Sequence, residues 1–170
     1  MGKECSVYLM LGSNMGDRNA MLIRATDLIR QRIGSVVCIS RCYETAPWGV
    51  FGLDEKPQNF YNQAVEVRTT LSPHDVLREA MCIEWILGRR RKEGGACYAS
   101  RPIDIDIILY DNLVTDTPDL TIPHPRMHLR RFVLEPMCDI APHYIHPQYN
   151  KPLSQLLEEC PDTSSCFCCS

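Results

Sequence analysis

The chain has 170 residues, 45% of them hydrophobic, and carries a formal net charge of -3 with a pI near 5.9. This size suits one compact domain with a substantial core and leaves no room for a second catalytic domain. The acidic balance argues against general nucleic-acid binding, and no apolar run is long enough to span a membrane. With no signal peptide at its polar start, we expect a cytoplasmic protein that acts on a small molecule.

Apolar spacing predicts alternating strands and helices along the first half of the chain. Residues 7–11 are typical of a strand, and helical spacing follows between Asp17, as the N-cap, and Gly34. Strands are then expected over residues 36–43 and 62–69. The loop between these two strands is too long for a simple hairpin, and such loops in compact domains usually carry function.

A second helix, a basic segment and a fourth predicted strand follow. Ser72, with Pro73 at the first helical position, begins a helix that is expected to end at Gly88. A basic run at residues 89–92 and a glycine-rich segment precede a strand that ends at Tyr110. The order β-α-β-β-α-β predicts a ferredoxin-like α+β fold, an antiparallel sheet with both helices on one face.

The remaining residues are C-terminal additions that must complete the other face of the sheet. We expect a short strand at residues 113–114, a helical segment at 126–137 and a short amphipathic helix at 153–157. The domain is therefore expected to cover residues 1–160, followed by a disordered, cysteine-rich tail over residues 161–170.

The chain has ten cysteines, which are scattered and form no C-x-x-C pair before the tail. This distribution fits reduced core thiols better than a disulfide framework. Cys160, Cys166, Cys168 and Cys169 crowd the end of the chain, so a zinc site is an alternative there, although adjacent ligands lack the usual spacing.

Two carboxylates two residues apart, Asp104 and Asp106, interrupt the β-branched strand before Tyr110. Alternation along a strand places both on one face, about 6.5 to 7 Å apart at Cα, with the isoleucines between and beside them on the other. Both acids stay ionised at low cost only beside positive charge, and hard oxygen ligands favour magnesium. Arg101 and the basic run at 89–92 supply the cations that phosphoryl transfer needs. Taken alone, such a pair is more often a solvated edge strand.

Four motifs together carry a resemblance to a known family. They are Gly12-Ser13-Asn14, Tyr43 to Pro47 with Phe60-Tyr61-Asn62, Arg101 to Leu109, and Pro123 to Leu134. In this order and spacing, the chain resembles the 6-hydroxymethyl-7,8-dihydropterin pyrophosphokinases from about residue 7 to residue 157. The resemblance implies transfer of a pyrophosphoryl group from ATP to the hydroxymethyl group of the reduced pterin, with release of AMP, in folate synthesis. The partners are therefore expected to be ATP and the pterin, with no nucleic acid and no membrane, and we expect a monomer because nothing in the sequence indicates an obligatory oligomer.

The resemblance implies three groups of site residues. The catalytic group is Arg89, Arg101, Asp104, Asp106 and Arg130, in which Asp104 and Asp106 hold two magnesium ions. The ATP-binding group is Glu84, Arg91, Ile107, Thr121 and His124. The pterin-binding group is Thr45, Trp48, Phe60, Asn62 and Phe132. Gly12, Ser13 and Asn14 are interpreted as architectural, because glycine and asparagine tolerate unusual backbone angles.

Each of these roles competes with a structural interpretation. Arg89 and Arg91 follow a helix C-terminus, where cations are favourable in any case. The two phenylalanines could be ordinary core residues, His124 a turn residue and Glu84 a solvated helix acid. The glycines at 94 and 95 favour a hypothesis in which residues 89–100 close over bound ATP.

Two other functions remain open. A ferredoxin-like fold also serves RNA recognition by base stacking on an open sheet, but the strands here lack the paired aromatic motif, and Asp104 and Asp106 would repel phosphate without metals. An inactive homologue with a regulatory role keeps the same motifs, so only turnover distinguishes it.

Overall fold

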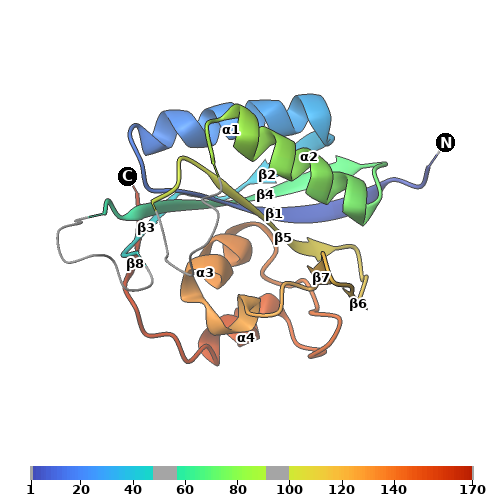
Figure 1. The fold of residues 1–170 in the computed structure, drawn as a ribbon. Coiled ribbons are helices and arrows are strands. Elements are labelled where there is room, and N and C mark those ends of the chain that lie inside the picture. The colour runs from blue at the N-terminus through green and yellow to red at the C-terminus, as the bar shows by residue number, and fades with distance from the viewer. Residues whose placement is uncertain (1, 48–56, 91–99, 170) are drawn as a thin grey trace.

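The computed structural model describes residues 2–47, 57–90 and 100–169, and an antiparallel sheet forms its middle layer (Figure 1). Among these residues the strands follow the order β5 (Asp104–Tyr110), β1 (Cys5–Ser13), β4 (Phe60–Thr69), β3 (Tyr43–Thr45) and β8 (Cys166–Cys168). Strand β2 (Ser35–Ile39) pairs with β4 beyond β3. Strands β1 and β4 are thus the central pair, flanked by β5 on one side and by β2 and β3 on the other.

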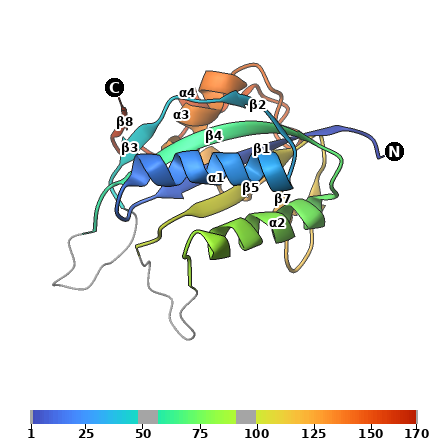
Figure 2. The ribbon, with the colours of Figure 1, turned by 90° about the horizontal axis from the view of Figure 1, so that it is seen from above.

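The two long helices α1 (Arg18–Arg32) and α2 (Pro73–Ile86) lie side by side on one face of the sheet (Figure 2). Both begin where the sequence predicts, because the Asp17 carboxylate accepts the Ala20 N–H at 3.0 Å and the Ser72 hydroxyl accepts the Asp75 N–H at 3.2 Å. The β-α-β-β-α-β prediction, with both helices on one face, is confirmed.

The C-terminal third covers the opposite face of the sheet (Figure 1). It contains β6 (Thr115–Asp116), β7 (Thr121–Ile122), a 3-10 turn (Met127–Leu129), α3 (Arg131–Ile140) and α4 (Leu153–Glu158). Alternation along β1 sends Val7, Leu9 and Leu11 toward α1 and α2, and Tyr8 and Met10 toward α3 and α4. The sheet therefore has an apolar core on each face.

Three predicted elements differ in extent. The single strand expected at 36–43 is interrupted, because Ser40 pairs with Ala64 through its own hydroxyl, which accepts the Ala64 N–H at 2.9 Å. The helix expected at 126–137 begins later, since Arg130 is extended, with a φ of -126° and a ψ of 106°. The short strand lies at 115–116 instead of 113–114.

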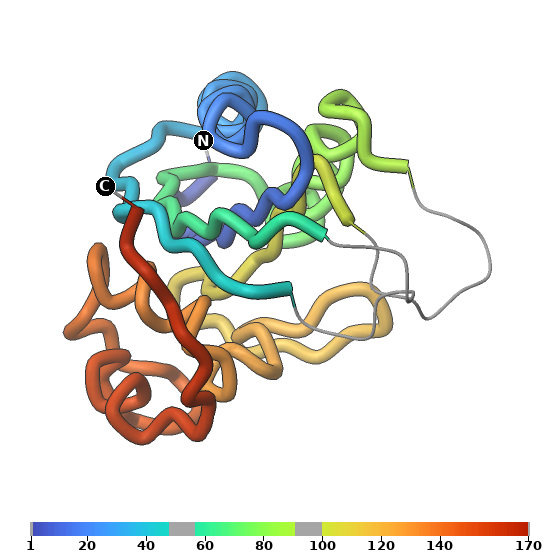
Figure 3. The backbone as a smooth tube through the Cα atoms, turned by 90° about the vertical axis from the view of Figure 1, so that its left-hand side faces the viewer, coloured from blue at the N-terminus to red at the C-terminus, as the bar shows by residue number. Residues whose placement is uncertain are grey.

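The expectation of a disordered tail is wrong for residues 166–168. These residues form β8, which pairs antiparallel with β3, and Figure 3 shows the tail running along this edge of the sheet. Without the tail, one edge of β3 would have no strand beside it, and β8 supplies the hydrogen-bond partners for that edge. Before it reaches β3, the tail is held by Asp162, whose carboxylate accepts the Arg131 N–H at 3.0 Å.

The zinc alternative for the tail gains no support, since no cluster of three or more potential ligands occurs in the part of the chain that the structure describes. Within the same residues, no helix is both long and apolar enough to cross a membrane.

Candidate active site

Gly12 lies at the meeting point of the predicted pterin and phosphate residues. The strand register places it opposite Asn62 on β4 and opposite Asp104 on β5. A Cβ at this position would lie 3.5 Å from Asn62 Oδ1, 3.6 Å from Phe60 Cδ1 and 4.0 Å from the Cβ of Asp104. Because Gly12 has no side chain, the backbone at this position is left uncovered between the two groups of residues, and we call this backbone surface the floor of the site. The sequence interpretation of Gly12 as architectural missed this role.

An arginine and acid cluster borders this floor on β5. One Asp104 oxygen accepts a hydrogen bond from Arg89 at 2.6 Å, and the other accepts one from Arg101 at 3.0 Å. Arg89 also donates to the Glu84 carboxylate at 2.6 Å, and that carboxylate accepts the Ile105 N–H at 2.8 Å. Burial alone would lower the pKa of Arg89, but Asp104 and Glu84 outweigh it and the pKa is raised. Glu84 is buried, so it is not a solvated helix acid, and it anchors both Arg89 and the start of β5.

Asp106 lies on the same face of β5 as Asp104, opposite Met10 of β1. Burial first, and then the negative charges of Asp104 and Glu84, raise its pKa to about 7, while Arg130 and Arg89 oppose the shift. A bound divalent cation would relieve this excess of negative charge. Two hard carboxylates on one strand face fit Mg2+, and Asp104 keeps lone pairs beyond the two that its arginines use.

His124 lies close enough to Arg130 and Asp104 for the charges of both to act on its ring. Its backbone N–H donates to the carbonyl of Ile108 at 2.9 Å, and its Nδ1 accepts the Arg126 N–H at 3.2 Å. Acceptance at Nδ1 leaves Nε2 as the donor of the neutral ring. Burial first, and then Arg130, lower the pKa of His124 to about 4, so the imidazole is neutral near pH 7.

Three of the predicted pterin residues, Thr45, Phe60 and Asn62, lie together on the paired strands β3 and β4. The Asn62 amide nitrogen donates to the Thr45 hydroxyl at 2.8 Å and to the Tyr43 carbonyl at 3.4 Å, and both Asn62 and Thr45 are buried. Phe60 is half-buried beside Gly12. Phe132, also half-buried, packs against the core under α3, with the Arg130 guanidinium 5.6 Å from its ring centroid.

The structure gives the remaining predicted site residues no side-chain contact with the cluster around Asp104, among the residues that it describes. Ile107 points into the core beneath α1 and α2, on the face opposite the two acids, so only its backbone can contribute. Thr121 donates to Asp116 within the small β6 and β7 sheet. Trp48 and Arg91 lie outside the described residues, as does most of the segment expected to close over ATP.

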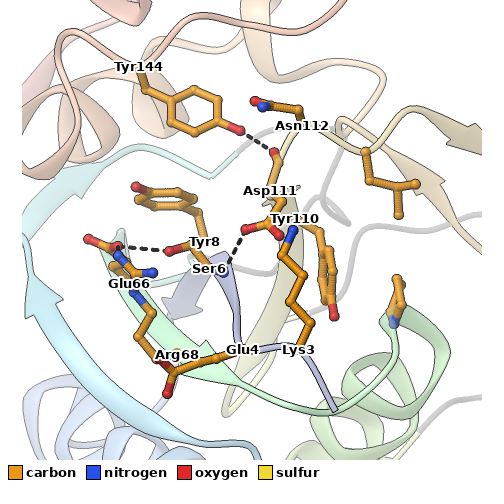
Figure 4. Close-up of a pocket in the computed structure, with 12 residues that line it drawn as sticks. Lys3, Glu4, Ser6, Tyr8, Glu66, Arg68, Tyr110, Asp111, Asn112 and Tyr144 are labelled. Atoms are coloured by element: carbon orange, nitrogen blue, oxygen red, sulfur yellow. Dashed lines mark hydrogen bonds and ion pairs between the residues drawn. The ribbon is translucent and has the colours of Figure 1, made fainter.

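A hollow lies at the other end of β1, where Figure 4 shows Ser6, Tyr8 and Asp111 around it. This cavity of about 820 Å³ contains none of the predicted site residues. Several of its polar groups bond to one another: the Asp111 carboxylate accepts the Ser6 N–H at 2.8 Å, and the Asp111 carbonyl accepts the Tyr144 hydroxyl. We therefore interpret it as a structural hollow.

Comparison with known proteins addresses the resemblance directly. Residues 8–142 match the family model described as 7,8-dihydro-6-hydroxymethylpterin-pyrophosphokinase. The chain belongs to this family. A 2-amino-4-hydroxy-6-hydroxymethyldihydropteridine pyrophosphokinase of Porphyromonas gingivalis is 44% identical over 147 residues, covering 86% of this chain and 97% of that protein. The enzyme of the same name from Aquifex aeolicus is 36% identical over 164 residues, or 96% of each chain.

The fold agrees with solved structures of the family. A wild-type Plasmodium falciparum HPPK-DHPS with pteroate superposes with a TM-score of 0.73 at 18% identity, covering 94% of this chain. The chain spans less than half of that longer protein, 43% of its length. At this identity the likeness establishes the ferredoxin-like fold of the family.

Proposed function

We propose that the chain transfers a pyrophosphoryl group from ATP to the hydroxymethyl group of 6-hydroxymethyl-7,8-dihydropterin, releasing AMP, as a step of folate synthesis. The observation that carries the proposal is the convergence at Gly12. Amide and aromatic groups suited to a flat heterocycle lie on one side of it, and an arginine and carboxylate cluster suited to a polyphosphate lies on the other. The family and the names of the relatives support the same reaction.

The pterin side of the site would recognise the ring through its edge and its faces. The hydrogen bond from Asn62 to Thr45 fixes the amide, so that Oδ1 points toward the floor at Gly12 and can accept an N–H of the ring edge. Phe60 and Phe132 are the proposed stacking partners for the ring faces, each contributing about 1 to 3 kcal/mol by analogy with base stacking. Trp48 remains a predicted contact of the same ring.

The phosphate side of the site would neutralise and orient the triphosphate. Arg89 and Arg101 are held by Asp104, and Arg130 adds a third cation near Asp106. The neutral His124 ring can donate from Nε2 to a phosphate oxygen without adding charge. Positioned cations of this kind stabilise the charge of a phosphoryl-transfer transition state. Glu84, Ile107, Thr121 and Arg91 are proposed to complete the nucleotide site, Ile107 through its backbone.

Asp104 and Asp106 are the residues that would hold magnesium, with two ions expected when ATP is bound. The metal would supply Lewis-acid activation of the phosphate and bring the substrate hydroxyl into line with it. This assignment also gives a reason for two acids to share one strand face, where burial, and then the charges of Asp104 and Glu84, raise the pKa of Asp106 in the free protein.

The RNA-binding alternative has little support from the fold. The face of the sheet that carries Tyr8 and Met10 is covered by α3 and α4 and forms a core, so it is not an open surface for bases. The acids on β5 would repel a nucleic-acid backbone.

The products of ATP turnover test the proposal. The protein is incubated with ATP, Mg2+ and 6-hydroxymethyl-7,8-dihydropterin, and the nucleotides and pterins are separated by chromatography. We expect AMP and the pterin pyrophosphate in equal amounts. Formation of ADP would contradict the pyrophosphoryl assignment, and pterin-independent hydrolysis or no turnover would indicate an inactive or different enzyme.

A further inference from the structure

The C-terminal strand brings a second cysteine opposite Cys42. In the pairing of β3 with β8, Tyr43 lies opposite Cys168 and Thr45 opposite Cys166. Continuing this register by one residue places Cys42 opposite Cys169, and the Cys169 N–H donates to the Cys42 carbonyl at 2.8 Å. Residues directly opposite in an antiparallel pair have Cα atoms about 4.5 to 5.5 Å apart, within the range that a disulfide requires.

The side chains of this pair also face each other. Side chains alternate along β8, so Cys169 lies on the same face as Cys42, whereas Cys166 and Cys168 lie on the other. The two thiols interact closely enough that, after burial, the Cys169 side chain is the next cause that raises the pKa of Cys42 to about 12. Both cysteines are free thiols and are only half-buried, so a small oxidant can reach them.

We propose that Cys42 and Cys169 form an oxidative modification site, at which a peroxide converts the two thiols into a disulfide that fastens β8 to β3. Hydrogen peroxide oxidises the Cys169 thiol to a sulfenic acid and releases one water. The Cys42 sulfur then attacks the sulfenic sulfur, and its proton leaves with the hydroxyl group as a second water. In total, two thiols and one peroxide give one disulfide and two waters.

Both attacks require a thiolate, and the raised pKa of Cys42 disfavours it as the thiol that reacts first with peroxide. The strand that becomes fastened ends at Thr45, whose hydroxyl accepts the hydrogen bond from Asn62. The crosslink would thus brace the edge of the pterin site. That consequence rests on the proposed function, whereas the crosslink itself does not.

Peptide mapping tests the proposal on the intact chain. The reduced protein is treated with hydrogen peroxide, free thiols are blocked with iodoacetamide, and unreduced digests are analysed by mass spectrometry. We expect a peptide pair joined through Cys42 and Cys169, which dithiothreitol separates. Cys42→Ser and Cys169→Ser should each abolish it, while Cys168→Ser, on the opposite face of β8, should leave it in place. Crosslinks through Cys168, or oxidation of Cys42 and Cys169 without a crosslink, would overturn the proposal.

Stability and hydrogen exchange provide a second test. A crosslink that closes so long a loop should raise the Tm of the oxidised chain by about 5 to 10 °C over the reduced chain. Backbone amides of residues 43–45 should exchange more slowly after oxidation. The Cys42→Ser chain should show neither change. An unchanged Tm in the intact chain after oxidation would contradict the fastening of β8 to β3.

Discussion

Both ends of β1 are surrounded by carboxylates, cations and aromatic rings, but the two ends differ in how their acids are placed. At the Ser6 end the hollow is large, and the Asp111 carboxylate there accepts the Ser6 N–H of β1. At the Gly12 end, Asp104 and Asp106 share a face with Glu84 nearby, and the pKa of Asp106 is raised to about 7 by burial and by these acids. The comparison teaches that a hollow by itself does not indicate a site, whereas buried charge that lacks full compensation does.

Removal of one acid from each end should give the largest contrast. Asp106→Asn should lower kcat/KM by about a thousandfold or more, because metal-assisted charge stabilisation amounts to several kcal/mol. Asp111→Asn is the matched control: Asp111 has a φ of 41°, which asparagine tolerates, and activity should stay within about twofold. Steady-state kinetics decide the matter, and equal losses in the two variants would remove the distinction between the ends.

The next largest contrast in activity is expected between substitutions of two neighbouring arginines, Arg130 and Arg131. Arg130→Ala should lower kcat/KM by about a hundredfold to a thousandfold, since a cation is lost beside Asp106. Arg131 is paired with Glu135 at 2.7 Å and donates to the Asp162 carbonyl, so Arg131→Ala should cost about 1 kcal/mol of unfolding free energy with little loss of activity. Kinetics and urea denaturation of both variants test this, and the opposite pattern would contradict the assignment.

Two glycine substitutions separate function from folding. Gly12→Ala places a methyl group at ordinary contact distances on the site floor, so activity should fall about tenfold with a stability change below about 1 kcal/mol. Gly34→Ala would place its Cβ 2.0 Å from the Arg68 carbonyl oxygen and should cost about 3 kcal/mol or more. If Gly12→Ala is fully active, substrate does not lie on that floor.

The pH dependence of stability tests the burial of Asp106 without any substrate. Without metal, the folded pKa of Asp106 is about 7, above the value near 3.9 of an unfolded chain. Between these values the folded state binds more protons, so the unfolding free energy falls as pH rises from about 4 to 7, by about 1 to 3 kcal/mol. The lowered pKa of His124 acts in the opposite direction, with stability rising from about pH 4 to 6.5.

The measured quantity is therefore the difference between the intact chain and Asp106→Asn. Urea denaturation with a chelator from pH 4 to 8 should show the intact chain losing stability relative to the variant as pH rises. If the unfolding free energies of the two chains vary with pH in parallel, burial and the neighbouring acids do not raise the pKa of Asp106.

The sequence predicts most of the fold because local signals and the apolar pattern agree. Asp17 and Ser72 mark the helix starts, and the isoleucines of β5 alternate with its acids, as the structure confirms. The interruption at Ser40 was not predictable, because the Ser40 hydroxyl accepts the backbone N–H of Ala64 on β4, a long-range contact without a local pattern. The pairing of β8 was missed for the same reason.

For the site, residue types indicated the chemistry and the strand register supplied the arrangement. Asp104, Arg89 and Arg101 were expected near one another and are hydrogen-bonded. The place of Gly12 depends on which residues lie opposite it on β4 and β5, which one strand's sequence does not contain. The position of Gly12 in the first motif was the available signal.

Calorimetric titration of a non-hydrolysable ATP analogue, with and without Mg2+, tests most directly that metal and nucleotide meet at the Gly12 end of β1. We predict magnesium-dependent binding to the intact chain and to Asp111→Asn, weakened at least about tenfold in Asp106→Asn. Unchanged binding to Asp106→Asn, or its loss in Asp111→Asn, would contradict the location of the site.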